Sequence, residues 1–152
     1  MHPAQIVDAA REQVSHALAQ HAVHVAVRAD ALVRLDPRLT AAGLAHLLDN
    51  AAKYSPAGGA IEVDAAIEGG ELVVSVRDHG AGVAPADMPR LFERFYRGTQ
   101  TVRVAGTGMG LSIVRGLLAV ERGRVWAENC ADGGAMFTIA VPVEQKPVEV
   151  SA

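Results

Sequence analysis

The sequence predicts an α+β fold: a two-layer sandwich in which a mixed, mostly antiparallel sheet carries helices on one face. Segments of helical period alternate along the chain with segments in which every second residue is apolar, as in strands. Short glycine-rich turns join most neighbouring strands, which indicates hairpins rather than helical crossovers. The length of 152 residues suits one domain with a single core.

The N-terminal part predicts a helix followed by a strand. Pro3 occupies a first-turn position, and apolar residues recur at helical spacing over residues 3–20. In the next segment Val23, Val25 and Val27 alternate with other residues, which predicts a short strand with the valines on one face.

The middle of the chain predicts a second helix and a β-hairpin. Asp36 followed by Pro37 is typical of a helix start, and the helical pattern continues to about Tyr54. Two alternating segments follow at 61–67 and 72–76, and the Glu-Gly-Gly between them predicts a hairpin turn.

The C-terminal part predicts one more helix and a second hairpin. Residues 78–108 are rich in Gly, Pro and Arg and hold one short helical stretch, and loops of that length in compact domains are usually functional or mobile. A helix over 109–121 precedes closing strands at 124–129 and 135–141, which end at Pro142.

Composition and charge narrow the function. A net charge of −3 gives no reason to expect nucleic acid as a partner. Lone Cys130 allows neither an internal disulfide nor a cysteine-based metal cluster, and it suits a reducing, cytoplasmic compartment. No apolar run approaches the roughly 20 residues of a membrane span, so we expect no membrane contact by this domain. Residues 1–142 are expected to form the single domain, and 143–152 a flexible tail.

The first motif that could carry chemistry is HLLDNAAKY, in the second predicted helix. Its polar residues share one side of the helix, with Asp49 at the margin. They are His46, Asp49, Asn50, Lys53 and Tyr54. One interpretation is a solvated face with an Asp49–Lys53 ion pair. The other is a phosphate and metal site, in which Asn50 offers an amide oxygen to Mg²⁺ and Lys53 a charge to phosphates.

The second motif, RDHGAGV, is the end of a strand followed by glycines. Asp78 in this position could accept a hydrogen bond from an amino group lying flat against bare backbone, and the adenine amine fits that geometry. Ordinary Asp/Gly turns show the same pattern, so the motif alone leaves both interpretations open.

The third motif, GTGMGLSIV, places glycines ahead of the last predicted helix. The approachable N–H groups and the dipole of such a helix start favour phosphate. The spacing does not fit the dinucleotide-binding fingerprint, because Leu111 stands where the third glycine belongs, and it does not fit the Walker A pattern.

The fourth motif, LFERFYRG, gathers Phe92, Phe95 and Tyr96 within five positions, among arginines that could stack or bind phosphate. These rings suit either a docking surface or lid anchor, or a plug of the local core.

In this order the four motifs resemble the N, G1, F and G2 boxes of the catalytic, ATP-binding domain of sensor histidine kinases. That domain belongs to the GHKL superfamily with the Bergerat fold, together with gyrase, the Hsp90 chaperone and MutL. The resemblance covers about residues 20–142, and the F box favours kinases over the other branches. The stretch from VHVAVRADALVRLDP to NAAKYSP is most similar to KdpD-like potassium-sensor kinases.

The resemblance implies a role for each nucleotide-binding residue. Asn50 would bind Mg²⁺, Lys53 would reach the phosphates of ATP, and Tyr54 would lie along the nucleotide. Asp78 would read the adenine amine. The floor of the adenine pocket would be formed by Gly80, Gly82 and Val83.

The long loop and the start of the last helix would hold the triphosphate. Arg97 would contact the terminal phosphate, Arg103 is a weaker candidate for that contact, and Tyr96 would touch the nucleotide. Phe92 and Phe95 would hold the lid and face the partner domain. The residues expected to wrap the triphosphate are Gly106, Thr107, Gly108, Met109, Gly110 and Leu111.

Three departures from the family pattern stand out. His46 replaces an Asn or Glu, so we assign it only a supporting or metal-binding role. Glu121-Arg122 stands where Ala/Glu-His-Gly commonly follows the late helix. No histidine of the chain has the sequence setting of a phosphoacceptor, and the helical hairpin that carries one is missing.

The resemblance therefore implies a catalytic domain that donates the γ-phosphoryl group of ATP, with Mg²⁺, to a histidine on a separate helical-hairpin domain, leaving ADP. Asn50, Lys53 and Arg97 would stabilise the transferring group. A response regulator would act downstream, and the isolated domain would be monomeric. Alternatives are an anti-sigma-factor-type serine kinase, a non-enzymatic nucleotide switch and an ATP-free binding module.

Overall fold

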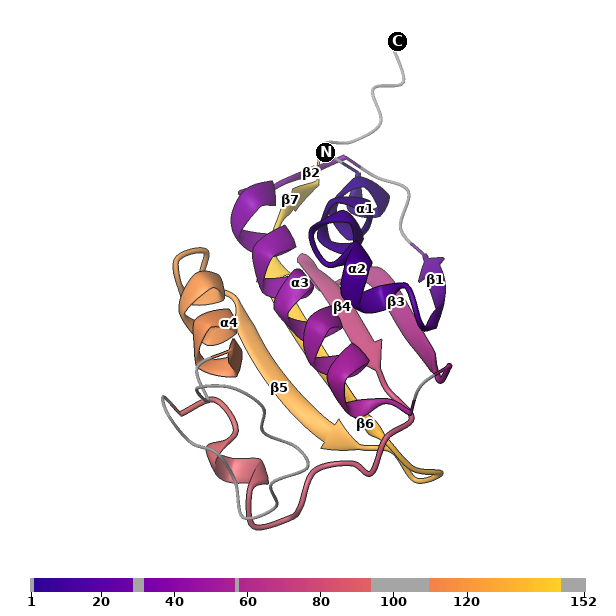
Figure 1. Ribbon diagram of the computed structural model, residues 1–152. Helices are drawn as coiled ribbons and strands as arrows, with labels where there is room; N and C mark the ends of the chain where they lie inside the picture. The colour runs from indigo at the N-terminus through magenta and orange to yellow at the C-terminus, as the bar shows by residue number, and fades with distance from the viewer. Residues whose placement is uncertain (1, 29–31, 57, 94–109, 146–152) are drawn as a thin grey trace, which may run out of the picture.

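The sheet has the mixed, mostly antiparallel form that the sequence predicts (Figure 1). A computed structural model describes residues 2–28, 32–56, 58–93 and 110–145. Five strands form the main sheet, in the order β1 (Ala22–Val27), β3 (Ala60–Glu68), β4 (Glu71–Arg77), β6 (Ala135–Pro142) and β5 (Arg124–Asn129). Strand β1 runs parallel to β3, and the other three pairs are antiparallel. The predicted fold class is therefore confirmed.

The two predicted hairpins are present, and they pair with each other through β4 and β6. In the first, Val63 lies opposite Val76 and Ala65 opposite Val74, and all four side chains are buried. Strand β4 then pairs with β6, so segments about 60 residues apart in the sequence become neighbours. This pairing brings the end of β4 beside the start of β6, where Asp78 of the candidate site lies.

Helices cover one face of the sheet, with α3 (Pro37–Tyr54) between α1 (Pro3–Gln13) and α4 (Gly110–Ala119) (Figure 1). The single helix expected over residues 3–20 is interrupted. Val14 has φ −123° and ψ 25°, outside the helical region, and a short helix, α2 (Ser15–Leu18), follows it. The short helical stretch expected in the long loop is a 3₁₀ turn, η1 (Met88–Arg90).

The N-terminal end of α3 is closed by polar contacts. The Asp36 side chain accepts hydrogen bonds from the N–H groups of Arg38 and Leu39, as the sequence predicts for an N-cap. Glu121, just after α4, accepts hydrogen bonds from the Asp36 N–H and, at 2.9 Å, from the Thr40 hydroxyl. Glu121 therefore ties the two helices together.

Helices α3 and α4 run antiparallel. Glu121 lies at the first turn of α3, whereas a Cβ added to Gly43 would lie 3.7 Å from Leu118 and 3.8 Å from Val114. Moving forward along α3 therefore means moving backward along α4. The start of α4 points toward the C-terminal end of α3.

The chain stays ordered past the expected start of the tail at residue 143. Glu144–Gln145 forms β7, which pairs with β2 (Val33–Arg34) in a separate two-stranded sheet. Residues 143–145 are therefore part of the fold rather than of the expected tail, because Val143 is bound to Gly70 and the two residues after it pair with β2. Residues 146–152 lie outside the described residues.

Candidate functional site

The C-terminal end of α3 lies against the turn that follows β4. A Cβ added to Gly80 would overlap the carbonyl oxygen of Tyr54, so only glycine permits this close approach. Asn50 lies one helical turn before Tyr54, roughly 6 Å along the helix axis. The structure thus brings residues from two predicted motifs, HLLDNAAKY and RDHGAGV, to one end of the molecule.

Asp78 is held rigidly at the junction of β4 and β6. Its side chain is 1% exposed. Its Oδ1 accepts hydrogen bonds from the N–H groups of Gly80, at 3.0 Å, and Ala135, at 3.2 Å. The Asp78 N–H donates to the Ala135 carbonyl at 2.9 Å. These contacts orient a buried carboxylate, which is the group that the adenine interpretation needs.

The turn after Asp78 is also fixed by a residue that the sequence analysis does not identify. Gly82 has φ 81°, a left-handed conformation that favours glycine. The next residue, Val83, is buried, and it exchanges two hydrogen bonds with the side chain of Asn129 at the end of β5. An Asn before a glycine-rich turn is too common a pattern to signal this contact in advance.

Buried polar atoms without partners mark the C-terminal end of α3. Two of the buried side-chain atoms that lack a hydrogen-bond partner among the described residues, Asn50 Nδ2 and Ser55 Oγ, lie at this end. Orphaned buried polar atoms are rare in folded proteins, because each costs about 1–3 kcal/mol. A polar ligand bound here would satisfy them.

Lys53 forms the ion pair with Asp49 that the sequence suggested as the simpler interpretation. The Lys53 Nζ to Asp49 Oδ2 distance is 3.0 Å, and the lysine side chain is half exposed. An exposed pair of this kind contributes about 0–1 kcal/mol. It can therefore open at little cost if Lys53 turns toward an anionic ligand.

The start of α4 adds a third element at this end of the molecule. Because α4 runs antiparallel to α3, its first residues, Gly110 and Leu111, lie toward the end of α3 that carries Asn50. Leu111 is half-buried against the core. The remaining residues of the predicted phosphate loop and lid lie outside the described residues: Phe95, Tyr96, Arg97, Arg103, Gly106, Thr107, Gly108 and Met109.

Phe92 belongs to the core. Its ring packs edge-to-face against buried Phe137, with the ring centroids 6.3 Å apart and an interplanar angle of 76°. The side chain is only partly buried, and this contact anchors the segment after η1 to the sheet.

Charged residues tie the β5–β6 turn to the end of β4. Arg77 donates a hydrogen bond to Asp132 and lies 3.8 Å from Glu62. The pKa of the Asp132 carboxyl is lowered, first by a hydrogen bond from its own backbone N–H and then by the Arg77 guanidinium. The pair supports the turn that supplies the Ala135 N–H to Asp78.

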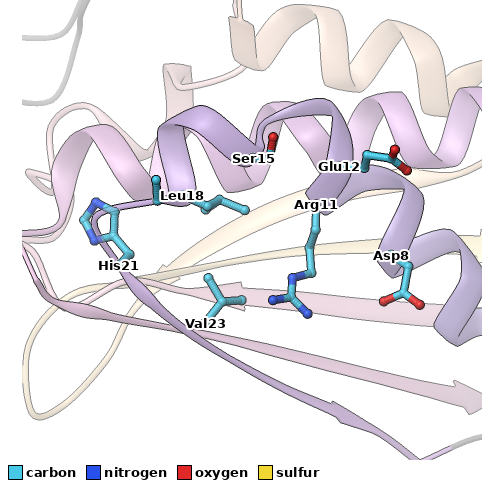
Figure 2. Close-up of a pocket in the computed structure, with 8 residues that line it drawn as sticks. Asp8, Arg11, Glu12, Ser15, Leu18, His21 and Val23 are labelled. Atoms are coloured by element: carbon cyan, nitrogen blue, oxygen red, sulfur yellow. The ribbon is translucent and has the colours of Figure 1, made fainter.

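A pocket of about 380 Å³ lies away from these residues, between α1, α2 and β1 (Figure 2). Its walls carry both charge signs and contain none of the predicted site residues. It is lined by Asp8, Arg11, Glu12, Ser15, Leu18, Ala19, His21 and Val23. We therefore place the candidate site where the predicted motifs meet, at the C-terminal end of α3, and not in this pocket.

Comparisons with known proteins identify the family of the chain. The family described as histidine kinase-, DNA gyrase B-, and HSP90-like ATPase matches residues 35–145. The chain is 37% identical over 116 residues to the sensor protein KdpD of Escherichia coli K12, which covers 76% of the chain and 13% of KdpD. It is also 37% identical over 142 residues to the sensor-like histidine kinase SenX3 of Mycobacterium tuberculosis H37Rv, covering 85% of the chain and 34% of SenX3. The chain thus spans only a minor part of these relatives.

Two solved structures extend the comparison to the fold. The mycobacterial sensor histidine kinase MprB superposes with a TM-score of 0.83 at 25% identity, over 96% of this chain and 99% of that one. Full-length ShkA in complex with AMPPNP superposes with a TM-score of 0.79 at 30% identity, over 93% of this chain and 30% of ShkA.

Proposed function

Because the chain belongs to the histidine kinase-, DNA gyrase B- and HSP90-like ATPase family, we propose that it transfers the γ-phosphoryl group of ATP to a histidine on a separate helical domain. The chain is an ATPase domain of the sensor histidine kinase type. The acceptor histidine, the helical hairpin that carries it and a downstream response regulator are the proposed partners.

One observation carries the proposal. Buried Asp78 and the unpartnered polar atoms of Asn50 and Ser55 lie at the same end of α3, beside a glycine that allows close backbone approach. An adenine nucleotide supplies an amino group for the carboxylate and polar atoms for the other two. The ShkA neighbour was solved with AMPPNP, an adenine nucleotide, which supports the same class of ligand here.

The residues at the end of α3 fit Mg²⁺ held mainly by phosphates. Among the described residues, no group of three His, Cys, Asp or Glu side chains could hold a metal ion by itself. Mg²⁺ commonly takes one or two protein oxygens and completes its shell with substrate phosphates and water. Asn50 would supply the amide oxygen, and His46, one turn earlier, would have a supporting role. Bound Mg²⁺ would neutralise phosphate charge during the transfer.

The chain's own residues position the nucleotide rather than attack it. Asp78 would hold the adenine amine, Tyr54 would lie along the nucleotide, and Gly80, Gly82 and Val83 would form the floor beneath the ring. Lys53 would leave its exposed pair with Asp49 and reach the phosphates, where its charge stabilises the transferring group. Gly110 and Leu111 would face the phosphates at the start of α4, where N–H groups are available.

The residues proposed for the lid complete the site. Arg97 would contact the terminal phosphate, and Tyr96 would contact the nucleotide. The triphosphate would be wrapped by Gly106, Thr107, Gly108 and Met109.

We also propose that the domain acts in the cytoplasm. Among the described residues, no helix has both the length and the apolar character of a membrane span.

Transfer of radiolabel from [γ-³²P]ATP tests this function. The chain is incubated with Mg²⁺ and a separate helical hairpin bearing an acceptor histidine, and the same hairpin with that histidine changed to alanine is the control. We expect acid-labile label on the first hairpin and none on the second. Acid-stable label on a serine would indicate a serine kinase. ATP binding without transfer to any supplied histidine would indicate a nucleotide switch.

A further inference from the structure

We propose that Asn129 is a positioning residue that sets the geometry of the adenine side of the site by holding Val83; the role rests on the function proposed above. Asn129 is the last residue of β5 and lies 46 positions from Val83 in the sequence. The Val83 N–H donates to Asn129 Oδ1 at 2.8 Å, and Asn129 Nδ2 donates to the Val83 carbonyl at 2.8 Å. One side chain thus satisfies both backbone groups of a single residue.

The chemistry of this contact requires an amide. An Asn side chain offers one acceptor and two donors, so it can pair with a backbone N–H and C=O at once, as a neighbouring strand would. An aspartate offers acceptors alone and would set an oxygen against the Val83 carbonyl. Alanine would lose both bonds.

The contact fixes the position of the segment that follows β4, residues 78–83, relative to the β5–β6 hairpin. At its start, Asp78 is bound to Ala135, and at its end Val83 is bound to Asn129, so the β5–β6 hairpin holds both ends. Gly82 fits closely between them, because an added Cβ would lie 2.9 Å from Asn129 Oδ1. A flat, rigid adenine ring needs its floor at a constant distance from the carboxylate that reads its amine. Asn129 keeps this distance constant by holding Val83, without itself touching the nucleotide.

Exposure separates this role from a role in folding. Val83 is 3% exposed, whereas the Asn129 side chain is exposed to solvent. Removing an exposed side chain leaves no cavity, so we expect Asn129→Ala to fold, with a melting temperature lowered by several degrees because the Val83 N–H and C=O lose their partners. The substitution should mainly loosen the segment between Asp78 and Val83.

Amide hydrogen exchange of Val83 in the nucleotide-free 152-residue chain tests the contact directly. We expect Asn129→Ala to speed exchange at Val83 about tenfold, because the acceptor for its N–H is lost. Asn129→Asp retains that acceptor, so it should restore most of the protection. The matched control is Glu128→Gln, an exposed neighbour on β5 that should leave exchange at Val83 unchanged.

Calorimetric titration of the same variants with ADP tests the consequence. We expect Asn129→Ala and Asn129→Asp to weaken ADP binding about three- to tenfold, the scale of one lost hydrogen bond, while Glu128→Gln binds as the wild type does. Unchanged Val83 exchange in Asn129→Ala, or ADP affinities within twofold of wild type in both variants, overturns the inference and leaves the proposed function intact. Failure of the wild-type chain itself to bind ADP overturns the proposed function instead. If Asn129→Ala does not fold, Asn129→Asp against Glu128→Gln decides the ADP comparison.

Discussion

The polar groups at the two ends of α3 differ in their hydrogen bonding. At the N-terminal end, buried Thr40 and the Asp36 N–H both donate to Glu121, and Asp36 in turn caps the helix. At the C-terminal end, Asn50 Nδ2 and Ser55 Oγ are buried without partners among the described residues. One end satisfies its hydrogen bonds within the protein, and the other leaves two of them open.

This difference separates stability from binding within a single helix. A satisfied polar cluster stabilises the fold, so substitutions there should lower the free energy of unfolding and leave ligand affinity unchanged. Orphaned polar atoms cost stability until a ligand satisfies them, so substitutions at the other end should have the reverse pattern. Four variants test this contrast.

The largest effect is expected from Asp78→Asn, at the binding end. The carboxylate is buried and aligned by two backbone N–H groups, and its neutral replacement would present a donor where the adenine amine needs an acceptor. We expect ADP affinity to fall by about 1–3 kcal/mol, measured by calorimetry. Asp8→Asn, which changes an exposed carboxylate on α1, is the control and should bind normally; normal binding by Asp78→Asn would remove Asp78 from the site.

Glu121→Ala should have the next largest effect, on stability. It removes the acceptor for the Thr40 hydroxyl, which is 0% exposed, and for the Asp36 N–H. We expect the free energy of unfolding to fall by about 1–3 kcal/mol in urea denaturation, with unchanged ADP affinity. Glu93→Ala breaks only an exposed pair with Arg90 and should cost less than about 1 kcal/mol. Equal losses of unfolding free energy in the two variants would mean that the contacts of Glu121 stabilise the protein no more than an exposed ion pair does.

Asn50→Ala reverses that pattern at the other end of the helix. We expect affinity for ADP with Mg²⁺ to fall about three- to tenfold, and more than affinity for ADP without metal. The melting temperature should stay the same or rise, since the change removes a buried orphaned amide and introduces a better helix former. Equal affinity losses with and without Mg²⁺ would argue against a metal role for Asn50.

The smallest effect concerns the turn after α4. Arg122 has φ 60°, a left-handed conformation that costs a non-glycine residue about 1–2 kcal/mol. Arg122→Gly removes that strain but gains entropy in the unfolded chain, so we expect a net stabilisation of about 0.5–1 kcal/mol. A lower melting temperature by calorimetry would show that the Arg122 side chain makes a compensating contact.

Much of the architecture was predictable because its signals are local. The period of apolar residues predicted both hairpins and α3, and Asp36-Pro37 predicted where α3 begins. The break at Val14 was not predictable, because apolar spacing continues through it. The pairing of Glu144–Gln145 with Val33–Arg34 was also invisible, since two-residue strands far apart in the sequence carry no period.

The candidate site divides in the same way. Asp78, Gly80 and Asn50 were identified because motifs and a family resemblance mark them. The contacts of Asn129 and Glu121 were missed because they are distant in sequence. Asn129 lies 46 residues from Val83, and Glu121 lies 81 residues from Thr40. The contact between Phe92 and Phe137 was not predictable from the motif, because the two rings lie 45 residues apart in the sequence.

Titration of the ¹⁵N-labelled chain with ADP and Mg²⁺, followed by amide chemical shifts, tests the central contrast most directly. Shifts should change at the C-terminal end of α3 and in the turn that follows β4, around Asn50, Ser55 and Gly80. Amides around Asp36 and Glu121, at the satisfied end, should stay in place. Changes confined to that end, or to the α1–β1 pocket of Figure 2, would contradict the account.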